Sequence, residues 1–257
     1  MRRAAGLVLA VVVLVPASAG AGTARPPLAL TATPAHVSLA GSSSSSIRVA
    51  NTGRTPVVVD AARAGFSLDL RGRPRVVAPG GLRAASPWLA IRPGRFVLAA
   101  GDSRWVTVSS RLPARVEPGD HDALVLLTTR PLRRGGVLVR MRIGVVVVVR
   151  APGPVTRRLA IGSLRVRRVR GARILELHLQ NRGNVTESLG AGRVRLQLSR
   201  GLTRATLRAE ARDLRPRSSG VVVMAYRGRM SGWVTARAQI VAQPGSRLVD
   251  RTFRIRL

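Results

Sequence analysis

The chain has 257 residues, of which 46% are hydrophobic and 21% charged, so it is not of the kind that stays disordered. Its 44 basic residues are all arginine, against 11 acidic residues, and the formal charge is +33. Cysteine is absent, which excludes disulfide bonds, thiolate metal sites and a cysteine nucleophile. Aromatic residues make up only 3%, so aliphatic side chains must fill the core, and the many valines favour strands.

The N-terminal segment, residues 1–24, predicts a signal peptide. Arg2 and Arg3 precede an apolar stretch, residues 7–15, and Pro16 and several small residues follow it. This order is typical of a cleaved export signal. A retained membrane anchor is the alternative, because the apolar segment is nearly long enough to span a bilayer. We therefore expect an exported protein that is extracellular or associated with the cell envelope.

Strand signals follow about every ten residues, separated by Gly, Pro, Asn and Asp, which is typical of an antiparallel sandwich. Val106 and Val108, for example, alternate with polar residues and would line one core face. The strands expected in the first half are residues 28–33, 46–51, 57–62, 88–91, 96–98, 104–109, 123–129 and 137–149. Trp88 and Phe96 would supply large groups to this core. For Trp88 the alternative is an exposed platform for sugar stacking.

Pro152, Gly153 and Pro154 predict a short, stiff connection between two domains. The first domain would span residues 25–151 and the second residues 152–257. Alternating strands are expected in the second half at residues 175–179, 194–198, 221–225, 234–241 and 252–257. The predicted fold is all-β, with two tandem immunoglobulin-like antiparallel β-sandwich domains after the signal peptide.

An internal repeat supports two similar domains. Alternating strands run into Asn51-Thr52-Gly53 in the first half and into Asn181-Arg182-Gly183 in the second. Asn can bond its own backbone, and Gly adopts positive φ easily, so each triplet predicts a strand exit.

A family resemblance rests on three stretches of the first domain. They are Pro87-Trp88-Leu89-Ala90-Ile91 with Phe96-Val97-Leu98, Gly101-Asp102-Ser103 with Val106-Thr107-Val108, and Pro113 with Pro118-Gly119-Asp120-His121. Residues 30–150 thereby resemble the WxL-interacting envelope proteins, which are similar in fold to pilus-assembly chaperones. The resemblance implies peptidoglycan or wall binding by the first domain and partner binding by the second. Residues 155–257 resemble only immunoglobulin-like domains in general. The C-terminal membrane anchor usual in that family is not expected, and no binding residue transfers.

Catalysis is not expected. His36, His121 and His178 lack metal-binding spacing, and they read as ordinary surface or edge histidines. Asp120-His121-Asp122 could orient an imidazole, but no nucleophile motif accompanies it. The sequence therefore predicts no enzymatic activity, no cofactor and no metal site.

The segment from Val137 to Val149 has two interpretations. Its second half is apolar on both faces, so it is expected to lie buried at the joint between the domains. Alternatively, it presents an edge to which a partner adds a strand. The residues of that candidate edge are Leu138, Arg140, Arg142, Val146 and Val148.

Clustered arginines are the candidate polyanion-binding residues: Arg133, Arg134, Arg157, Arg158, Arg165, Arg167, Arg168 and Arg170. Most would lie on solvated strand faces, but together they could grip phosphates or carboxylates. Nucleic acid is a poor partner, because no recognition motif or array of stacking aromatics is present. The expected function is a non-enzymatic envelope protein that contacts an anionic wall polymer, peptidoglycan or another exported protein. The alternative is a chaperone-like protein that binds a partner by strand addition.

Overall fold

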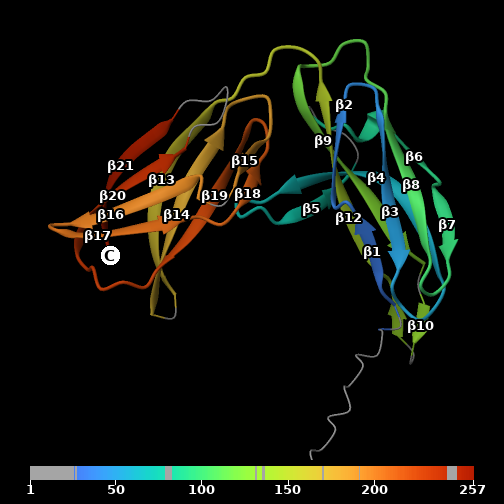
Figure 1. Ribbon diagram of the computed structural model, residues 1–257, viewed down its shortest axis with the longest axis horizontal. Coiled ribbons are helices and arrows are strands. Elements are labelled where there is room, and N and C mark those ends of the chain that lie inside the picture. Colours follow the sequence, from blue (N-terminus) through green and yellow to red (C-terminus); the bar gives the residue numbers. More distant parts are fainter. Residues whose placement is uncertain are drawn as a thin grey trace, which may run out of the picture.

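The computed structural model describes residues 26, 28–78, 83–130, 132–134, 137–169, 171–190, 192–241 and 248–257. The fold is all-β, with two immunoglobulin-like domains, as the sequence predicts (Figure 1). The predicted signal peptide, residues 1–24, lies outside the described residues. Within the described ranges, no helix has the length and apolar character needed to cross a membrane.

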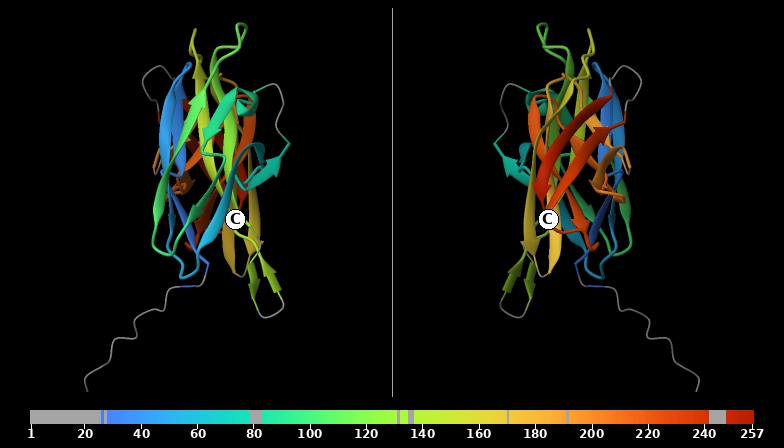
Figure 2. Two further views of the ribbon diagram at one scale, coloured as in Figure 1. Left: turned by 90° about the vertical axis from the view of Figure 1, so that its right-hand side faces the viewer. Right: turned by 90° about the vertical axis from the view of Figure 1, so that its left-hand side faces the viewer.

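The first domain packs two sheets face to face. One sheet has the order β1 (Leu30–Thr33), β3 (Ser44–Asn51), β8 (Ser103–Ser110) and β6 (Leu89–Arg92). The other has the order β2 (His36–Ala40), β12 (Arg142–Ala151), β9 (Gly119–Thr129), β4 (Val57–Leu68) and β5 (Pro74–Val77), and β7 (Arg95–Leu98) also pairs with β4. A 3-10 helix, η1 (Ser86–Trp88), precedes β6. A hairpin of β10 (Leu132–Arg134) and β11 (Val137–Val139) projects at one end (Figure 2).

The second domain repeats this architecture. One of its sheets has the order β13 (Leu159–Val169), β14 (Ala172–Asn181) and β19 (Ser218–Tyr226), and the facing sheet has the order β17 (Thr203–Arg208), β16 (Val194–Arg200), β20 (Trp233–Ile240) and β21 (Val249–Arg256). A small pair of strands, β15 (Glu187–Leu189) and β18 (Arg212–Leu214), completes it.

Each domain has its own aliphatic core, built by alternation along the strands. In the first, Ile47 and Val49 of β3 and Val106 and Val108 of β8 are all fully buried. Trp88 packs against this core from η1, which confirms its predicted core role, although it belongs to the 3-10 helix and not to a strand.

The Asn-x-Gly repeat is confirmed as a strand exit in both domains. Asn51 Oδ1 accepts a hydrogen bond from Gly53 N (3.0 Å), and Asn181 Oδ1 accepts one from Gly183 N (2.9 Å). Both asparagines are buried, and each donates its amide to the backbone carbonyl four residues on. Neither glycine is among the described glycines with positive φ. At Gly183 the reason for glycine is space, since a Cβ would lie 2.3 Å from Thr156 O.

The single strand predicted for residues 137–149 is wrong. β11 ends at Val139 and β12 begins at Arg142. The ladder is interrupted because Met141 N donates to the side-chain oxygen of Thr129 (2.9 Å), where a continuous strand would bond a backbone carbonyl. The prediction also omitted β2 and β13, whose apolar residues alternate over short or irregular stretches, and the strands β5, β10, β15, β17 and β18.

Candidate functional site

The two domains meet at the start of β9, where three consecutive polar residues are buried. Asp120 and His121 are each 1% exposed, and Asp122 is 4% exposed. Because side chains alternate along a strand, the two carboxylates point to one face of the sheet and the imidazole to the other. Thr186 N, in the second domain, donates to Asp120 Oδ2 (2.7 Å), so the carboxylate face is the one turned toward that domain.

Asp120 joins the end of β12 to the second domain. Arg150 donates from Nε to Oδ1 (2.7 Å) and from Nη2 to Oδ2 (3.0 Å), which is a bidentate ion pair. Burial raises the pKa of Asp120, but the hydrogen bonds from Arg150 and Thr186 lower it by more, so its pKa lies below the ordinary value. The carboxylate is therefore ionised at neutral pH.

Asp122 pairs directly with an arginine of the second domain. Arg215 Nε donates to Asp122 Oδ2 (2.6 Å) and Arg215 Nη1 donates to Phe66 O (3.0 Å). The guanidinium also lies 4.5 Å from the centroid of the Phe66 ring, within cation–π range. Burial raises the pKa of Asp122 above its ordinary value, although Arg215 opposes this shift.

His121 is a core residue, which corrects its predicted surface or edge position. Its Nε2 is 2.7 Å from Glu117 O, and its ring centroid lies 4.6 Å from that of Trp88. Neither neighbouring aspartate can orient the imidazole, because both face the opposite side of the sheet and pair with arginines. The Asp-His-Asp segment therefore joins domains and does not form a catalytic relay.

Asn184, in the turn before β15, packs against the turn before β9. Its backbone carbonyl accepts from Asp120 N (2.8 Å), and its side-chain amide donates to Pro118 O (3.1 Å) and Pro154 O (2.8 Å). A Cβ at Gly119 would lie 2.1 Å from the Asn184 carbonyl oxygen. The Pro118-Gly119 turn thus contacts both the second domain and the connection between the domains.

The turn between β4 and β5 makes a further contact. Leu70 O accepts from Val221 N (2.6 Å) and from Arg212 Nη1 (3.0 Å), and Arg71 forms an ion pair with Glu176 (2.6 Å). In Figure 1, β4 and β5 reach from the first domain toward the second. A hairpin tip of one domain is therefore bonded to the sheet of the other.

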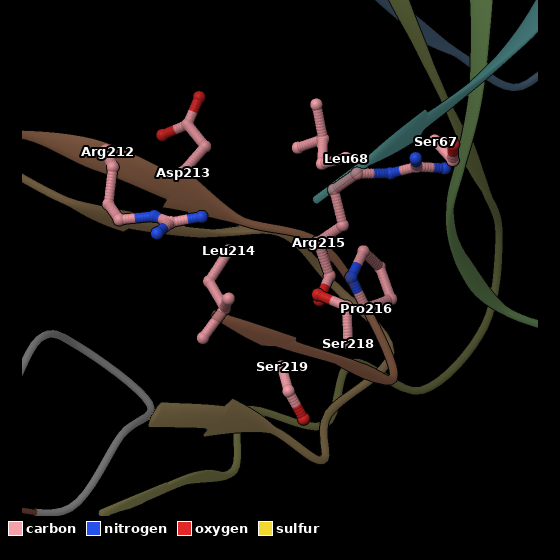
Figure 3. A pocket seen from close by; sticks show the side chains of 9 residues that line it. All are labelled: Ser67, Leu68, Arg212, Asp213, Leu214, Arg215, Pro216, Ser218 and Ser219. Carbon is pink, nitrogen blue, oxygen red and sulfur yellow. The ribbon is translucent and has the colours of Figure 1, made fainter. Parts of the chain in front are cut away.

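A pocket of about 250 Å³ lies beside this tip. Figure 3 shows the residues that line it, which are Ser67 and Leu68 of the first domain and Arg212, Asp213, Leu214, Arg215, Pro216, Ser218 and Ser219 of the second. Arg212 Nη1 also donates to Val221 O, so one guanidinium is held by carbonyls of both domains. Burial lowers the pKa of Arg212. The pocket is thus part of a joint held by several polar contacts.

Strand β12 has an open edge away from this joint. It pairs with β9 over all of Arg142–Ala151, whereas β2 covers its other side only from Val146 to Arg150. Arg142–Val145 therefore has no partner on that side among the described strands. Met141 and Ile143, which flank Arg142, are partly buried against the first core. A short edge with apolar side chains beside it can receive an extended segment of another chain.

Comparison with known proteins identifies solved structures with a similar fold. No protein-family model matches the sequence, and no curated protein sequence matches it. The chain is similar to the solved structure of the YadV chaperone, with 10% identity, a TM-score of 0.50 and coverage of 88% of this chain and 99% of that chain. It is also similar to the class 5 fimbriae chaperone CfaA, with 12% identity, a TM-score of 0.50 and coverage of 87% and 98%. The fold resembles that of the pilus chaperones. These comparisons support that part of the predicted resemblance and do not single out the WxL-interacting proteins.

In this chaperone-like fold the five predicted edge residues lie in different places. Val146 and Val148 are not at an edge, because β2 and β9 flank β12 at both positions. Val148 lies opposite Asp122 in the ladder, on the face turned toward the joint. Arg140 is exposed in the break before β12, and Arg142 is exposed on the open edge. Leu138 lies on β11.

The predicted polyanion-binding arginines do not form one surface. Arg133 and Arg134 lie on β10, at the far end of the first domain (Figure 1). Arg157 pairs with the buried Glu187 (3.1 Å), and Arg167 shares Glu176 with Arg71. Arg158, Arg165 and Arg168 are exposed, and Arg170 lies outside the described residues. Two of the eight candidates thus neutralise carboxylates of the protein itself.

Sequence reasoning missed Arg150 and Arg215, the arginines that pair with the buried carboxylates Asp120 and Asp122 at the joint. The small number of acidic residues could have indicated which arginines form structural ion pairs. With 11 acidic residues against 44 basic ones, a carboxylate within a strand is a strong indicator of a paired, structural arginine. Among the described residues, no cluster of His, Asp and Glu could hold a metal ion.

Proposed function

We propose that this protein is a chaperone-like binder of another exported protein, which it captures by β-strand addition at the open edge of β12. The observation that carries the proposal is that β2 leaves Arg142–Val145 uncovered while β9 pairs with it throughout. Likeness to two chaperones, one of them a chaperone of fimbriae, supports a protein partner of this kind. On this proposal the protein works outside the cytoplasm.

The ladder identifies the backbone groups that are free at this edge. Val146 N donates toward β2, to Ala35 O (3.1 Å), and Met141 O accepts from Thr129 N of β9 (3.0 Å). Because successive residues alternate in direction, the N–H and C=O groups of Arg142 and Gly144 point to the open side. An added strand would bond these two residues and pack beside Met141 and Ile143. We therefore expect an extended partner segment with alternating apolar residues.

The wall-polymer or peptidoglycan binding expected from the sequence stays a prediction. The arginines expected to bind such a polymer lie in separate places in the structure. They therefore form no common polymer-binding surface in the first domain.

A photo-crosslinking amino acid at position 143, introduced in the producing cell, tests strand addition. We expect cross-links to one extended segment of an exported protein. They should be lost in Arg142→Pro and kept in Arg142→Ala, because both substitutions remove the guanidinium but only proline removes the N–H. Cross-links that survive in Arg142→Pro would contradict the proposal.

A further inference from the structure

The outer face of the sheet β17–β16–β20–β21 carries an ordered array of polar side chains. The strand register aligns them in rows: Arg204, Ser199, Thr235 and Arg254, then Thr206, Gln197, Arg237 and Thr252, then Arg208, Arg195, Gln239 and Asp250. The alternate residues, such as Leu196 and Ala236, are fully buried. The right panel of Figure 2 shows β20 and β21 in front, on the side away from the first domain.

This face is strongly basic. Its outward arginines are Arg195, Arg204, Arg208, Arg237, Arg254 and Arg256, and they are exposed. Asp250 is the one outward carboxylate of these four strands, and it pairs with Arg237. Among the described residues, no carboxylate forms an ion pair with Arg204, Arg254 or Arg256. Their charges are free to meet an anionic ligand, unlike those of Arg157 and Arg167.

An exposed tryptophan lies at one end of the same face. Trp233 is 56% exposed, and the Arg254 guanidinium lies 5.1 Å from its ring centroid. Arg256 is its direct neighbour across the strands. Two hollows, of about 500 and 340 Å³, adjoin here and share Ser199, Gly201 and Thr235 in their linings. The face therefore combines an aromatic platform, unpaired cations and hydroxyl groups around recessed surface.

We infer that this face binds an anionic polysaccharide. The carboxylates or other anionic groups of such a polymer would pair with the unpaired guanidinium groups. The hydroxyl groups of the polymer would hydrogen-bond the Ser, Thr and Gln side chains, and the apolar side of a sugar ring would pack on the exposed indole. The face spans about 14 Å across its four strands, enough for a short stretch of polymer. Nucleic acid fits less well, because successive bases need several aromatic platforms and Trp233 is the one outward aromatic residue of these strands.

A membrane surface is the competing partner, since Leu202 in the adjoining turn is fully exposed. The rows of Ser, Thr and Gln favour the polysaccharide, because an acyl boundary offers these groups no partners. The inference does not rest on strand addition, and Arg142→Pro should leave polysaccharide binding unchanged.

Binding of the purified protein to immobilised polygalacturonate, beside polyglutamate as a polyanion without sugar rings, tests the inference. At about 0.15 M salt, Trp233→Ala should weaken polygalacturonate binding about tenfold and leave polyglutamate binding unchanged. Trp105→Ala is the matched control, because Trp105 is 62% exposed beside Arg48 in the first domain.

The arginines are tested with a charge-matched pair of variants. Arg204→Ser/Arg254→Ser should weaken binding of both polymers by more than Arg75→Ser/Arg104→Ser, which removes the same charge from exposed positions in the first domain. Equal effects of the two double variants, or of Trp233→Ala and Trp105→Ala, would overturn the inference. So would Trp233-dependent binding to phosphatidylglycerol vesicles without binding to polygalacturonate, which would assign the face to a membrane surface.

Discussion

Gly119 and Asn184 belong to different domains and touch through their backbones. A Cβ at position 119 would lie 2.1 Å from the Asn184 carbonyl oxygen, and Gly119 has a φ of 109°. That carbonyl also accepts a hydrogen bond from Asp120 N (2.8 Å). The closeness of the two backbones leaves no space for a side chain at this point of the joint.

Gly119→Ala should lower the free energy of unfolding by about 3 kcal/mol. The methyl group meets a backbone carbonyl, which cannot rotate away as a side chain could. Urea unfolding measures the loss. Gly101→Ala is the control, because Gly101 also has positive φ (85°) but nothing lies within 4 Å of its Cβ position, so only backbone strain of about 1–2 kcal/mol is expected. Equal losses would show that the contact with Asn184 is unimportant.

Asp120→Asn should cost about 2 kcal/mol of unfolding free energy. The substitution weakens the bonds from Arg150 and Thr186, while Arg150, which is partly exposed, can still reach water. Asp60→Asn should have a clearly smaller effect, because the ion pair of Asp60 with Arg95 is exposed. Chemical unfolding of both variants compares them, and a larger loss in Asp60→Asn would refute the assigned role.

Asp120 and Asp122 should respond to pH in opposite directions. The pKa of Asp120 is lowered, so its stabilising contribution is present above the unfolded-state pKa and is lost as the pH falls through the folded-state pKa. The pKa of Asp122 is raised, so on acidification the folded state binds this proton at a higher pH than the unfolded state does. The free energy of unfolding therefore increases as the pH falls through that raised value.

Unfolding free energies between about pH 7 and pH 3 test this difference. As the pH falls, the difference in unfolding free energy between the wild type and Asp120→Asn should decrease. The difference between the wild type and Asp122→Asn should increase in favour of the wild type. Trends in the same direction for the two variants would contradict the opposite shifts.

Two proline substitutions on β12 should differ in their effect on folding. Val146→Pro removes the N–H that bonds Ala35 O and disturbs pairing with β2, so it should cost more than about 2 kcal/mol. Arg142→Pro removes an N–H at the open edge and should change stability little. Thermal unfolding with circular dichroism gives both values. A severe loss in Arg142→Pro would mean that this edge is covered in the folded protein.

Many of the strands could be predicted from the local pattern of the sequence. Alternating residues such as Val106 and Val108, and the two Asn-x-Gly exits at Asn51 and Asn181, predicted strands that the structure contains. We propose the boundary between the domains after Ala151, where β12 ends. The break at Arg140 and Met141 could not be predicted, because it depends on a hydrogen bond that Met141 N donates to the side chain of Thr129, twelve residues away.

The candidate sites depended on distant parts of the chain. The sequence does not distinguish an arginine that pairs with a buried carboxylate, such as Arg157, from one that has no carboxylate partner among the described residues, such as Arg254. The open edge of β12 likewise depends on where β2 stops pairing, more than a hundred residues earlier in the chain.

The amino-acid sequence by itself determined the all-β class and the placement of several strands, because strand formation follows from the alternation of neighbouring residues. Tertiary structure alone decided that Val146 is covered while Arg142 is open, that Asp120 and Asp122 join the domains, and that arginines of four strands share one face. These properties arise from pairing and ion contacts between residues far apart in the chain, for which local periodicity carries no information.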